Sequence, residues 1–506
     1  MLDFRPALWY AMHIMYNCCG IRSAHEDEMV GRNGMANNFR VSNIEQRKNK
    51  TAMKKGAIPH VARDVAYQTA PILRETGPAK FNFYYSSAVE GDLGNLLGSP
   101  HYSYRFAEAK FVSMLTSYKV NAHKLKMPEY YNTAAAIPKS MRLDDASDLH
   151  LIFRSAEQIR LLKFAWNIAC FAWEFDVIKD ETQIDEHPFL NQKRMLALCN
   201  EIWVPCSYTK SVLERYGLTN VHVIPAPITI GPKRPSVRAA LSHLADVVVA
   251  PLHFNFLRSQ SQNRAACRRG LSTLGEWIGR SIEQFDVPRV YLTILNPEDF
   301  RKNLDALLRA FYHFSNQHRE SILMVKVLTS AARFDLLDVL SDVVPKKMAS
   351  GTVFGSENIV FFNDFLSESQ MRHLFALADF YLSASLCEGQ NLPLLEAMTH
   401  GIVPVTTANT AMADYIDANN AVIIKDHLVL NDCVHLAGTI AGRPFSIRRS
   451  EVGDIHDGLQ RSAMLTPARY TAMAARGKRM IRERYAPDAV WSNIRARLAT
   501  IPKCGS

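Results

Sequence analysis

The sequence predicts an α/β protein with two doubly wound domains, each a parallel sheet covered by helices. Three observations predict this class. Short apolar runs alternate with amphipathic helical segments along most of the chain. Prolines cluster between residues 225 and 238, where we expect a domain boundary because proline disrupts helices and central strands alike. The chain has 506 residues, 48% of them hydrophobic and 21% charged, which is enough for two globular cores.

The first 78 residues show no strong periodicity and are expected to form a flexible N-terminal extension. Arg40, Arg47, Lys48 and Lys50 lie there among asparagine, glutamine and glycine, a composition typical of a solvated basic segment. A second hypothesis is that this basic extension contacts an anionic membrane surface. Residues 8–19 are apolar, but they are too few for a membrane span and follow no basic stretch. We therefore expect a cytoplasmic protein, either free or peripheral at the inner membrane surface.

The first predicted domain covers residues 79–228. Residues 81–85 read as an aromatic strand, three glycines follow between residues 91 and 98, and residues 102–118 carry apolar side chains at helical spacing. A strand, a glycine-containing loop and a helix make the first unit of a doubly wound domain, although these glycines do not match a dinucleotide fingerprint. Further elements are expected as strands at 149–153 and 221–224 and a helix at 208–216 that Gly217 ends.

The second predicted domain covers residues 290–480. Residues 229–289 before it are expected to be a linker or an insertion of uncertain structure, and residues 481–506 after it a C-terminal helix. Ser367 and Gln370 have the spacing of a capping box at a helix start. The expected strands are 290–295, 322–328, 359–362 and 380–382, and the expected helices are 304–314, 367–377, 467–484 and 488–498.

The most informative segment is a strand, a loop and a helix between residues 380 and 398. Glu388 and Gly389 lie in the loop, Asn391 is a candidate N-cap, and Glu396 lies in the helix that follows. The free N–H groups and the dipole at a helix start favour a phosphate, and glycine permits close approach of a ligand to the backbone. Two acids at this spacing decide little alone, because acids are common.

The residues around this pair resemble a known family. Residues 388–398 and the Gly-x-x-Pro-Val at 401–405 resemble the donor-site signature of the group 1 retaining glycosyltransferases (glycosyltransferase family 4), which have the GT-B fold of two Rossmann-like domains facing a cleft. The Trp-Glu at 173–174 and the Ile-Trp-Val-Pro at 202–205 resemble the family's first domain. Arg301 and Lys302 resemble its second donor motif.

The resemblance implies a role for each of these residues. Glu388 would contact the donor sugar and Glu396 the ribose, while Arg301 and Lys302 would bind the diphosphate. Glu388, Lys302 and Arg301 are the expected catalytic residues. Donor binding would involve Gly389, Gln390, Asn391, Leu392 and Glu396. Gln390 departs from the family, which usually has an aromatic or small residue there.

The implied reaction is transfer of a sugar with retention, in polysaccharide or glycoconjugate synthesis. A nucleoside diphosphate sugar is the expected co-substrate, and we expect neither a cofactor nor a metal. The acceptor would be a glycan or a lipid-linked molecule, for which His101 and His150 are candidate contacts, although a lone histidine is more often structural. In the GT-B fold the last helix crosses back to the first domain.

Net charge and cysteine content limit which partners and which cysteine-based sites the protein is expected to have. A net charge of +10 and a pI near 9.1 favour anionic partners such as phosphate-bearing substrates, lipid headgroups or nucleic acid. We expect no nucleic acid partner, because the basic residues come with no recognition motif. Nine cysteines without regular spacing predict neither a disulfide framework nor a zinc site.

Two other functions remain open from the sequence. One is an epimerase or phosphorylase on the same two-domain fold, which would share the architecture without the two-glutamate element. The other is a non-catalytic protein that binds a nucleotide sugar.

Overall fold

The computed structural model describes ten stretches of the chain, all within the compact unit Pro78–Ser506. The predicted N-terminal extension and the loop with three glycines lie outside the described residues. The described stretches are residues 81–87, 101–133, 147–180, 187–231, 235–252, 271–285, 289–329, 335–344, 356–431 and 444–501.

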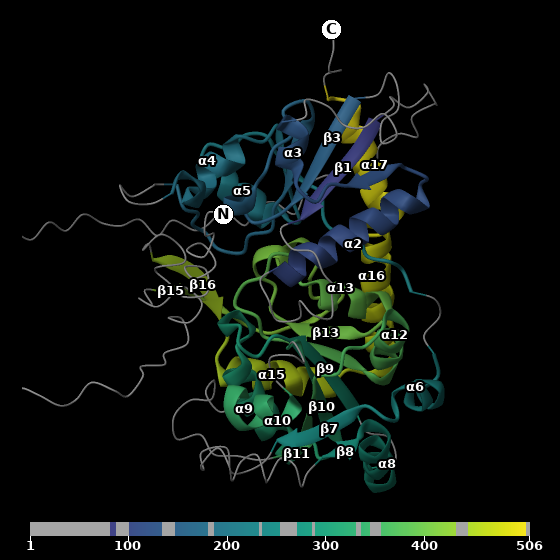
Figure 1. The fold of residues 1–506 in the computed structure, drawn as a ribbon. Helices are drawn as coiled ribbons and strands as arrows, with labels where there is room; N and C mark the ends of the chain where they lie inside the picture. The colour runs from purple at the N-terminus through teal and green to yellow at the C-terminus, as the bar shows by residue number, and fades with distance from the viewer. Residues whose placement is uncertain are drawn as a thin grey trace, which may run out of the picture. The chain divides into compact units, whose positions relative to one another are not determined.

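The first sheet has six parallel strands in the spatial order β2-β1-β3-β4-β5-β6, of which Figure 1 shows β1 and β3 side by side. The chain leaves β1 for β2 on one side and returns for β3 on the other, so the topological switch point of this sheet lies between β1 and β3. The strands are β1 (Phe81–Ser87), β2 (Ala122–Lys124), β3 (Ser147–Phe153), β4 (Trp166–Cys170), β5 (Glu201–Val204) and β6 (Val221–Val223).

Helices cover both faces of this sheet because its strands are apolar on both sides. Leu151 and Phe153 of β3 pack in one cluster with α2 (His101–Ser117), while Ile152 points into the opposite cluster with α5 (Ser207–Arg215). Gly217 has the left-handed backbone (φ 83°) that ends α5 as predicted. The remaining helices here are α3 (Pro128–Thr133), α4 (Gln192–Ala197) and the 3-10 turns η3 (Ala156–Gln158) and η4 (Pro188–Leu190).

The second sheet has eight strands in the order β14-β13-β12-β9-β10-β11-β7-β8. All neighbours are parallel except β7 and β8, which pair antiparallel at one edge. Since β9 lies between β10 and β12, the switch point of this sheet is between β9 and β12. The strands are β7 (Val248–Leu252), β8 (Ser272–Thr273), β9 (Arg289–Leu295), β10 (Ser321–Val327), β11 (Ser356–Phe362), β12 (Phe380–Ser383), β13 (Val403–Thr406) and β14 (Val422–Ile423).

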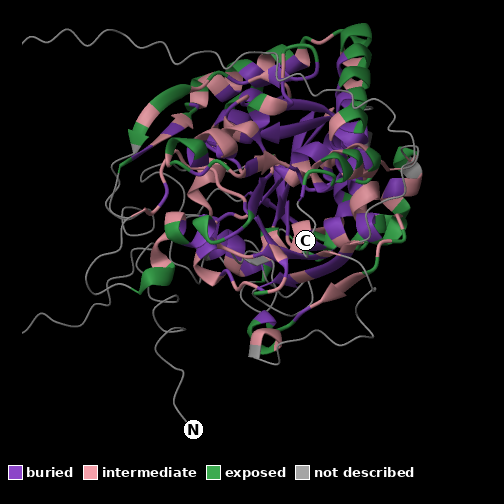
Figure 2. Ribbon diagram, turned by 90° about the horizontal axis from the view of Figure 1, so that it is seen from above, coloured by how far each residue is buried: buried purple, intermediate pink, exposed green. Residues whose placement is uncertain are grey.

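The second sheet is also buried on both faces, and Figure 2 shows strands coloured as buried in the interior. Tyr291 packs with α9 and α15 on one face, and Leu292 packs with α12 and α13 on the other. The helices are α6 (Val237–Leu244), α8 (Leu274–Phe285), α9 (Leu304–Gln317), α10 (Leu336–Asp338), α12 (Glu368–Leu377), α13 (Leu392–Thr399), α15 (Val452–Ala463) and α16 (Pro467–Arg484). Shorter elements are η5 (Phe300–Lys302), η6 (Val339–Val343), η7 (Thr410–Asp414), β15 (His427–Asn431) and β16 (Phe445–Arg449).

Two doubly wound domains confirm the predicted fold class, α/β of the GT-B kind. The last described helix, α17 (Pro487–Leu498), packs on the first sheet although it follows the second domain. Its Trp491 stacks on Tyr118 with ring centroids 5.3 Å apart, and its Arg497 pairs with Glu201 at 2.9 Å. The capping box at Ser367 is present as predicted.

The segment 229–289, whose structure the sequence left uncertain, contributes to the second sheet. Its β7 pairs antiparallel with β11, and its helices α6 and α8 pack in the second domain's core. Antiparallel pairing with a strand far along the chain leaves no local sequence pattern, so this addition could not be predicted. No helix among the described residues combines the length and apolar character needed to cross a bilayer.

His150 is a core residue of the first sheet. It has no exposed surface in the middle of β3, and its ring nitrogens lie 2.9 Å from Ser86 Oγ and 3.1 Å from Asn167 Oδ1. Burial lowers the pKa of His150 to about 4, against a hydrogen bond that its ring donates to Asn167 Oδ1, which raises the pKa. The suggestion that His150 contacts an acceptor is therefore wrong, because a side chain without surface meets no substrate. The side chain of His101 lies outside the described part of α2.

This burial predicts a pH dependence of folding stability. Because the folded-state pKa of about 4 is below the ordinary value of 6.5, the unfolded chain binds a proton first as the pH falls. The stability that neutral His150 contributes is complete above pH 6.5 and is lost towards pH 4, by up to about 3 kcal/mol. Urea unfolding between these pH values should show a smaller loss for His150→Gln than for the wild type. Exposed His313→Gln is the control, and equal slopes in all three proteins would contradict this account.

Candidate functional site

Two loops meet at the switch point of the second sheet, where β9 and β12 both end. The loop after β9 carries Arg301 and Lys302, and the loop after β12 carries Ser385 and Glu388. The N–H of Leu386 donates to the carbonyl of Arg301 at 2.8 Å, which fixes the two loops to each other. The carboxyl ends of parallel strands at a switch point form the usual ligand crevice of such sheets.

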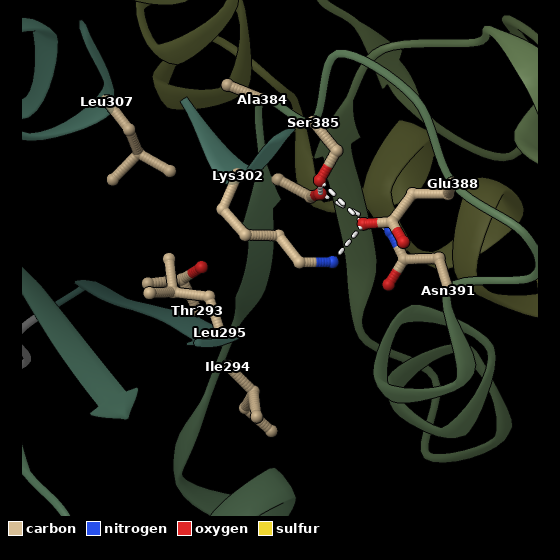
Figure 3. Close-up of a pocket in the computed structure, with 10 residues that line it drawn as sticks. Thr293, Ile294, Leu295, Lys302, Leu307, Ala384, Ser385, Glu388 and Asn391 are labelled. Carbon is tan, nitrogen blue, oxygen red and sulfur yellow. Dashed lines mark hydrogen bonds and ion pairs between the residues drawn. The ribbon is translucent and has the colours of Figure 1, made fainter. Parts of the chain in front are cut away.

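Lys302 and Glu388 form a buried ion pair there, with Nζ and Oε1 2.5 Å apart (Figure 3). The hydroxyl of Ser385 donates to the same carboxylate oxygen at 2.7 Å, and the backbone N–H of Glu388 donates to Thr410 Oγ1 at 2.8 Å. Burial alone would raise the pKa of Glu388, but the charges of Lys302 and Arg301 outweigh it and hold the pKa below its usual value. Glu388 is therefore an ionised carboxylate at neutral pH.

A small cavity lies beside this pair, and its lining joins charged and apolar side chains. Figure 3 shows Lys302 extending across it toward Glu388 and Asn391. The complete lining is Thr293, Ile294, Leu295, Lys302, Leu307, Ser383, Ala384, Ser385, Glu388 and Asn391. The sequence predicted Lys302, Glu388 and Asn391 for this site, whereas it missed the strand-end serines, which have no distinctive spacing.

Arg301 binds two carboxylates. Its Nε lies 2.9 Å from Asp299 Oδ1 and its Nη2 lies 2.7 Å from Asp299 Oδ2, which is a forked interaction. Its Nη1 donates to Glu174, which follows β4 in the first domain. A guanidinium that already binds oxyanions in this way suits a phosphate group equally well.

The start of α13 differs from the predicted cap. Asn391 stands at the N-cap position, but its backbone is left-handed (φ 57°, ψ 62°) and its side chain makes no capping hydrogen bond. Its amide lies 3.4 Å from Ser383 Oγ instead. The helix therefore begins at Leu392 with N–H groups that the Asn391 side chain leaves unused, and such groups favour an anion.

Gln390 binds the first domain's boundary segment rather than lining the cavity. Its Nε2 donates to the carbonyl of Ala226 at 3.0 Å, and its Oε1 accepts from the N–H of Ala226 at 3.2 Å. Ala226 lies between Pro225 and Pro227, neither of which has a backbone N–H to offer. This pairing gives a physical reason for glutamine at a position where the resembling family has aromatic or small residues.

Gly389 and Glu396 also meet the first domain. A Cβ on Gly389 would lie 3.4 Å from Ala172 Cβ and 3.5 Å from Glu174 Oε2, which are ordinary van der Waals distances, so Gly389 lies against the first domain without any need for glycine on steric grounds. Glu396 of α13 pairs with Lys110 of α2 at 2.9 Å. The partners Lys110 and Glu174 were not predicted as site residues, although Glu174 belongs to the Trp-Glu motif.

Residues 290–440 match the family model described as Glycosyl transferases group 1, which covers less than half of the chain. The match contains Arg301, Lys302, Glu388 and Glu396, and it confirms the predicted resemblance to group 1 glycosyltransferases over this domain. Assignment to family 4 and retention stay predictions. Comparison with curated proteins finds no match.

Several solved structures are similar to this chain at low sequence identity. A mutant of TarM from S. aureus, in complex with Fondaparinux, alpha-GlcNAc-glycerol and UDP, has 12% identity and a TM-score of 0.43 over 73% of this chain and 58% of TarM. HepE from Anabaena, in complex with UDP and glucose, has 9% identity and a TM-score of 0.48 over 83% and 99% of the two chains. A UDP-forming trehalose-phosphate synthase from Burkholderia xenovorans has 12% identity and a TM-score of 0.43 over 70% and 74%. This chain thus spans less than two thirds of the length of TarM.

Replacing Lys302 should lower the stability of the fold, because it leaves the buried charge of Glu388 without its ion-pair partner. Lys302→Met leaves the carboxylate without its closest cation, and we expect a loss of unfolding free energy of about 3 kcal/mol at pH 7. The double variant Lys302→Met/Glu388→Gln should recover part of that loss, as measured by urea unfolding. A double variant that is less stable than Lys302→Met would show that the charge is not the cause.

Replacing Gln390 should weaken the contact with Ala226. Gln390→Ala leaves the N–H and the carbonyl of Ala226 without their side-chain partner, which costs about 1–3 kcal/mol when the groups are buried. Thermal unfolding should therefore show a lower midpoint than for the wild type and for Gln284→Ala, an exposed glutamine of α8. Equal midpoints in all three proteins would mean that the contact adds nothing to stability.

Proposed function

We propose that this protein transfers a sugar from a nucleoside diphosphate sugar to an acceptor hydroxyl, with retention, in the synthesis of a polysaccharide or glycoconjugate. One observation carries the proposal: Lys302, Arg301 and an ionised Glu388 converge at a switch point inside the region that matches the group 1 family model. An epimerase, a phosphorylase or a non-catalytic binding protein is not favoured by any separate observation.

The cationic side chains would act on the leaving group. When the bond between the anomeric carbon and the diphosphate oxygen breaks, negative charge grows on the diphosphate. Lys302 supplies a compact positive charge and Arg301 a forked donor, and the N–H groups at the start of α13 add partial positive charge. All three come from the loops that end β9 and β12, so they are positioned before the donor arrives.

The carboxylates would orient the donor. Glu388 is ionised and can only accept hydrogen bonds, which suits the hydroxyls of a sugar ring. Glu396 would accept from the ribose hydroxyls beside Lys110. With the acceptor hydroxyl on the same face as the departing diphosphate, the diphosphate oxygen itself can take the proton, so the transfer needs no base from the protein.

Donor binding would exchange one anion for another at Arg301. In the structure the guanidinium binds Glu174 of the first domain as well as Asp299. A diphosphate brings more charge than a single carboxylate and would compete with Glu174 for Nη1. We place the reaction in the cytoplasm, with a glycan or a lipid-linked acceptor, the latter bringing the protein to the membrane surface.

The activity test follows from the role of Glu388. Thermal-shift measurements with UDP-, GDP- and dTDP-sugars identify the donor, and donor hydrolysis or transfer is then measured. We expect Glu388→Gln to lower kcat by about 100-fold or more, because the donor sugar then lacks the charged carboxylate that accepts its hydrogen bonds. Glu368→Gln, at an exposed position on α12, should leave it unchanged.

Three results would count against the proposal. Full activity in Glu388→Gln would show that Glu388 has no role in catalysis. Donor binding without turnover in the wild type would favour a binding protein. Release of sugar phosphate from a glycan on addition of inorganic phosphate, with no nucleotide sugar present, would favour a phosphorylase.

A further inference from the structure

The first sheet carries a second cluster of functional side chains, at its own switch point. We propose that Arg154, Arg160 and Ser87 bind a phosphate group of the acceptor there. That the bound molecule is an acceptor rests on the proposed function. That the site binds phosphate is argued from the geometry of the first domain alone.

Topology brings these residues together at the carboxyl edge of the sheet. Ser87 is the last residue of β1, and Phe153 opposite it is the last residue of β3. Arg154 follows Phe153 directly, and η3 and Arg160 come next in the chain. The switch point of the first sheet lies between β1 and β3, and in open parallel sheets ligands bind outside the strand ends at such a point.

Polar atoms in this cluster are buried without a partner. Ser87 is 6% exposed, and its Oγ has no hydrogen-bond partner within the described part of the chain. Nε of Arg154 and Oε1 of Gln158 are buried atoms that likewise have none there. Among the described residues, Arg154 makes one long hydrogen bond, from Nη1 to the carbonyl of Gln158 at 3.5 Å. Buried polar groups nearly always have partners, so these three atoms at the carboxyl end of the first sheet are consistent with a ligand site.

Two arginines of this cluster lie near enough to repel each other. Within the described stretches, neither Arg154 nor Arg160 lies within ion-pair distance of a carboxylate, and Arg160 donates to its neighbouring carbonyl and stacks on Phe189. The nearby acid Glu108 already binds Arg105 and Lys124. Burial lowers the pKa of Arg154 and the charge of Arg160 lowers it further, while the carboxylates of Glu129 and Glu108 act in the opposite direction. An anion between the two guanidiniums would relieve this repulsion.

Phosphate is the anion that fits the donors best. A guanidinium offers a rigid fork of N–H groups, which matches two oxygens of a phosphate, and a serine hydroxyl can donate to a third. Two arginines balance the two charges of a phosphate monoester. A neutral glycan would leave both charges unbalanced, so the site favours an acceptor with a phosphate.

Contacts within the first domain connect this site to the donor side. The hydroxyl of Tyr104 on α2 donates to the carbonyl of Ala172 at 3.5 Å, and the charge of Glu157, next to Gln158, acts on the same tyrosine. Ala172 lies two residues before Glu174, the partner of Arg301. An acceptor held by its phosphate at Arg154 would thus lie along the edge that leads to the donor residues.

Calorimetric titration of the full chain with inorganic phosphate tests the site without any need for turnover. We expect phosphate binding that persists in Lys302→Met, because the donor site is separate, and that weakens roughly tenfold or more in Arg154→Gln and in Arg160→Gln. Arg194→Gln, an exposed arginine of α4, should bind as the wild type does. Circular dichroism establishes that each variant is folded. If Arg154→Gln does not fold, the variant Arg160→Gln, at a partly exposed position, still tests the site.

Two results would overturn the inference: no phosphate binding to the wild type, or equal binding in the wild type and in both arginine variants. Loss of all binding in Lys302→Met would assign phosphate to the donor site and overturn it as well. Failure of donor turnover with intact phosphate binding would instead reject the proposed function alone. Glycerol 3-phosphate and phosphatidylcholine vesicles containing phosphatidic acid, as separate competitors, distinguish a soluble phosphate ester from a lipid one.

Discussion

The buried ion pair between Lys302 and Glu388 is the interaction on which the donor side depends. It joins the loops that end β9 and β12, which are neighbours in space and 86 positions apart at these two residues. Burial penalises each charge alone, and the pair with the Ser385 hydroxyl offsets that penalty. The result is a carboxylate that stays ionised beside a lysine and an arginine, and the proposed function uses this combination to bind a sugar diphosphate.

The same residues hold the two doubly wound domains in contact. Arg301 reaches Glu174, Gln390 reaches Ala226, and Glu396 reaches Lys110, so each donor residue has a first-domain partner or lies next to one that has. In the proposed function, donor binding would therefore involve side chains that also hold the two domains in contact.

Local physics made much of this predictable. The strands at 81–85, 149–153 and 290–295 and the helix at 304–314 were confirmed, because apolar periodicity is strong where a sheet is buried on both faces. The positions of Lys302 and Glu388 at strand ends followed from the alternation of strands and helices. Two expectations failed for tertiary reasons: Asn391 turns inward to Ser383, and His150 is enclosed between Ser86 and Asn167.

The sequence by itself determined the fold class, the strand and helix order, and the residues of the donor motif, because these depend on hydrophobic spacing and on residue chemistry within short segments. Only the tertiary structure decided which groups pair across the chain. It placed Gln390 on Ala226 and added β7 and β8 to the second sheet. It also left Nε of Arg154 and Oγ of Ser87, at the first switch point, without a hydrogen-bond partner among the described residues. Such pairings join residues far apart in the sequence, so they cannot be predicted from the pattern of residues within a short segment.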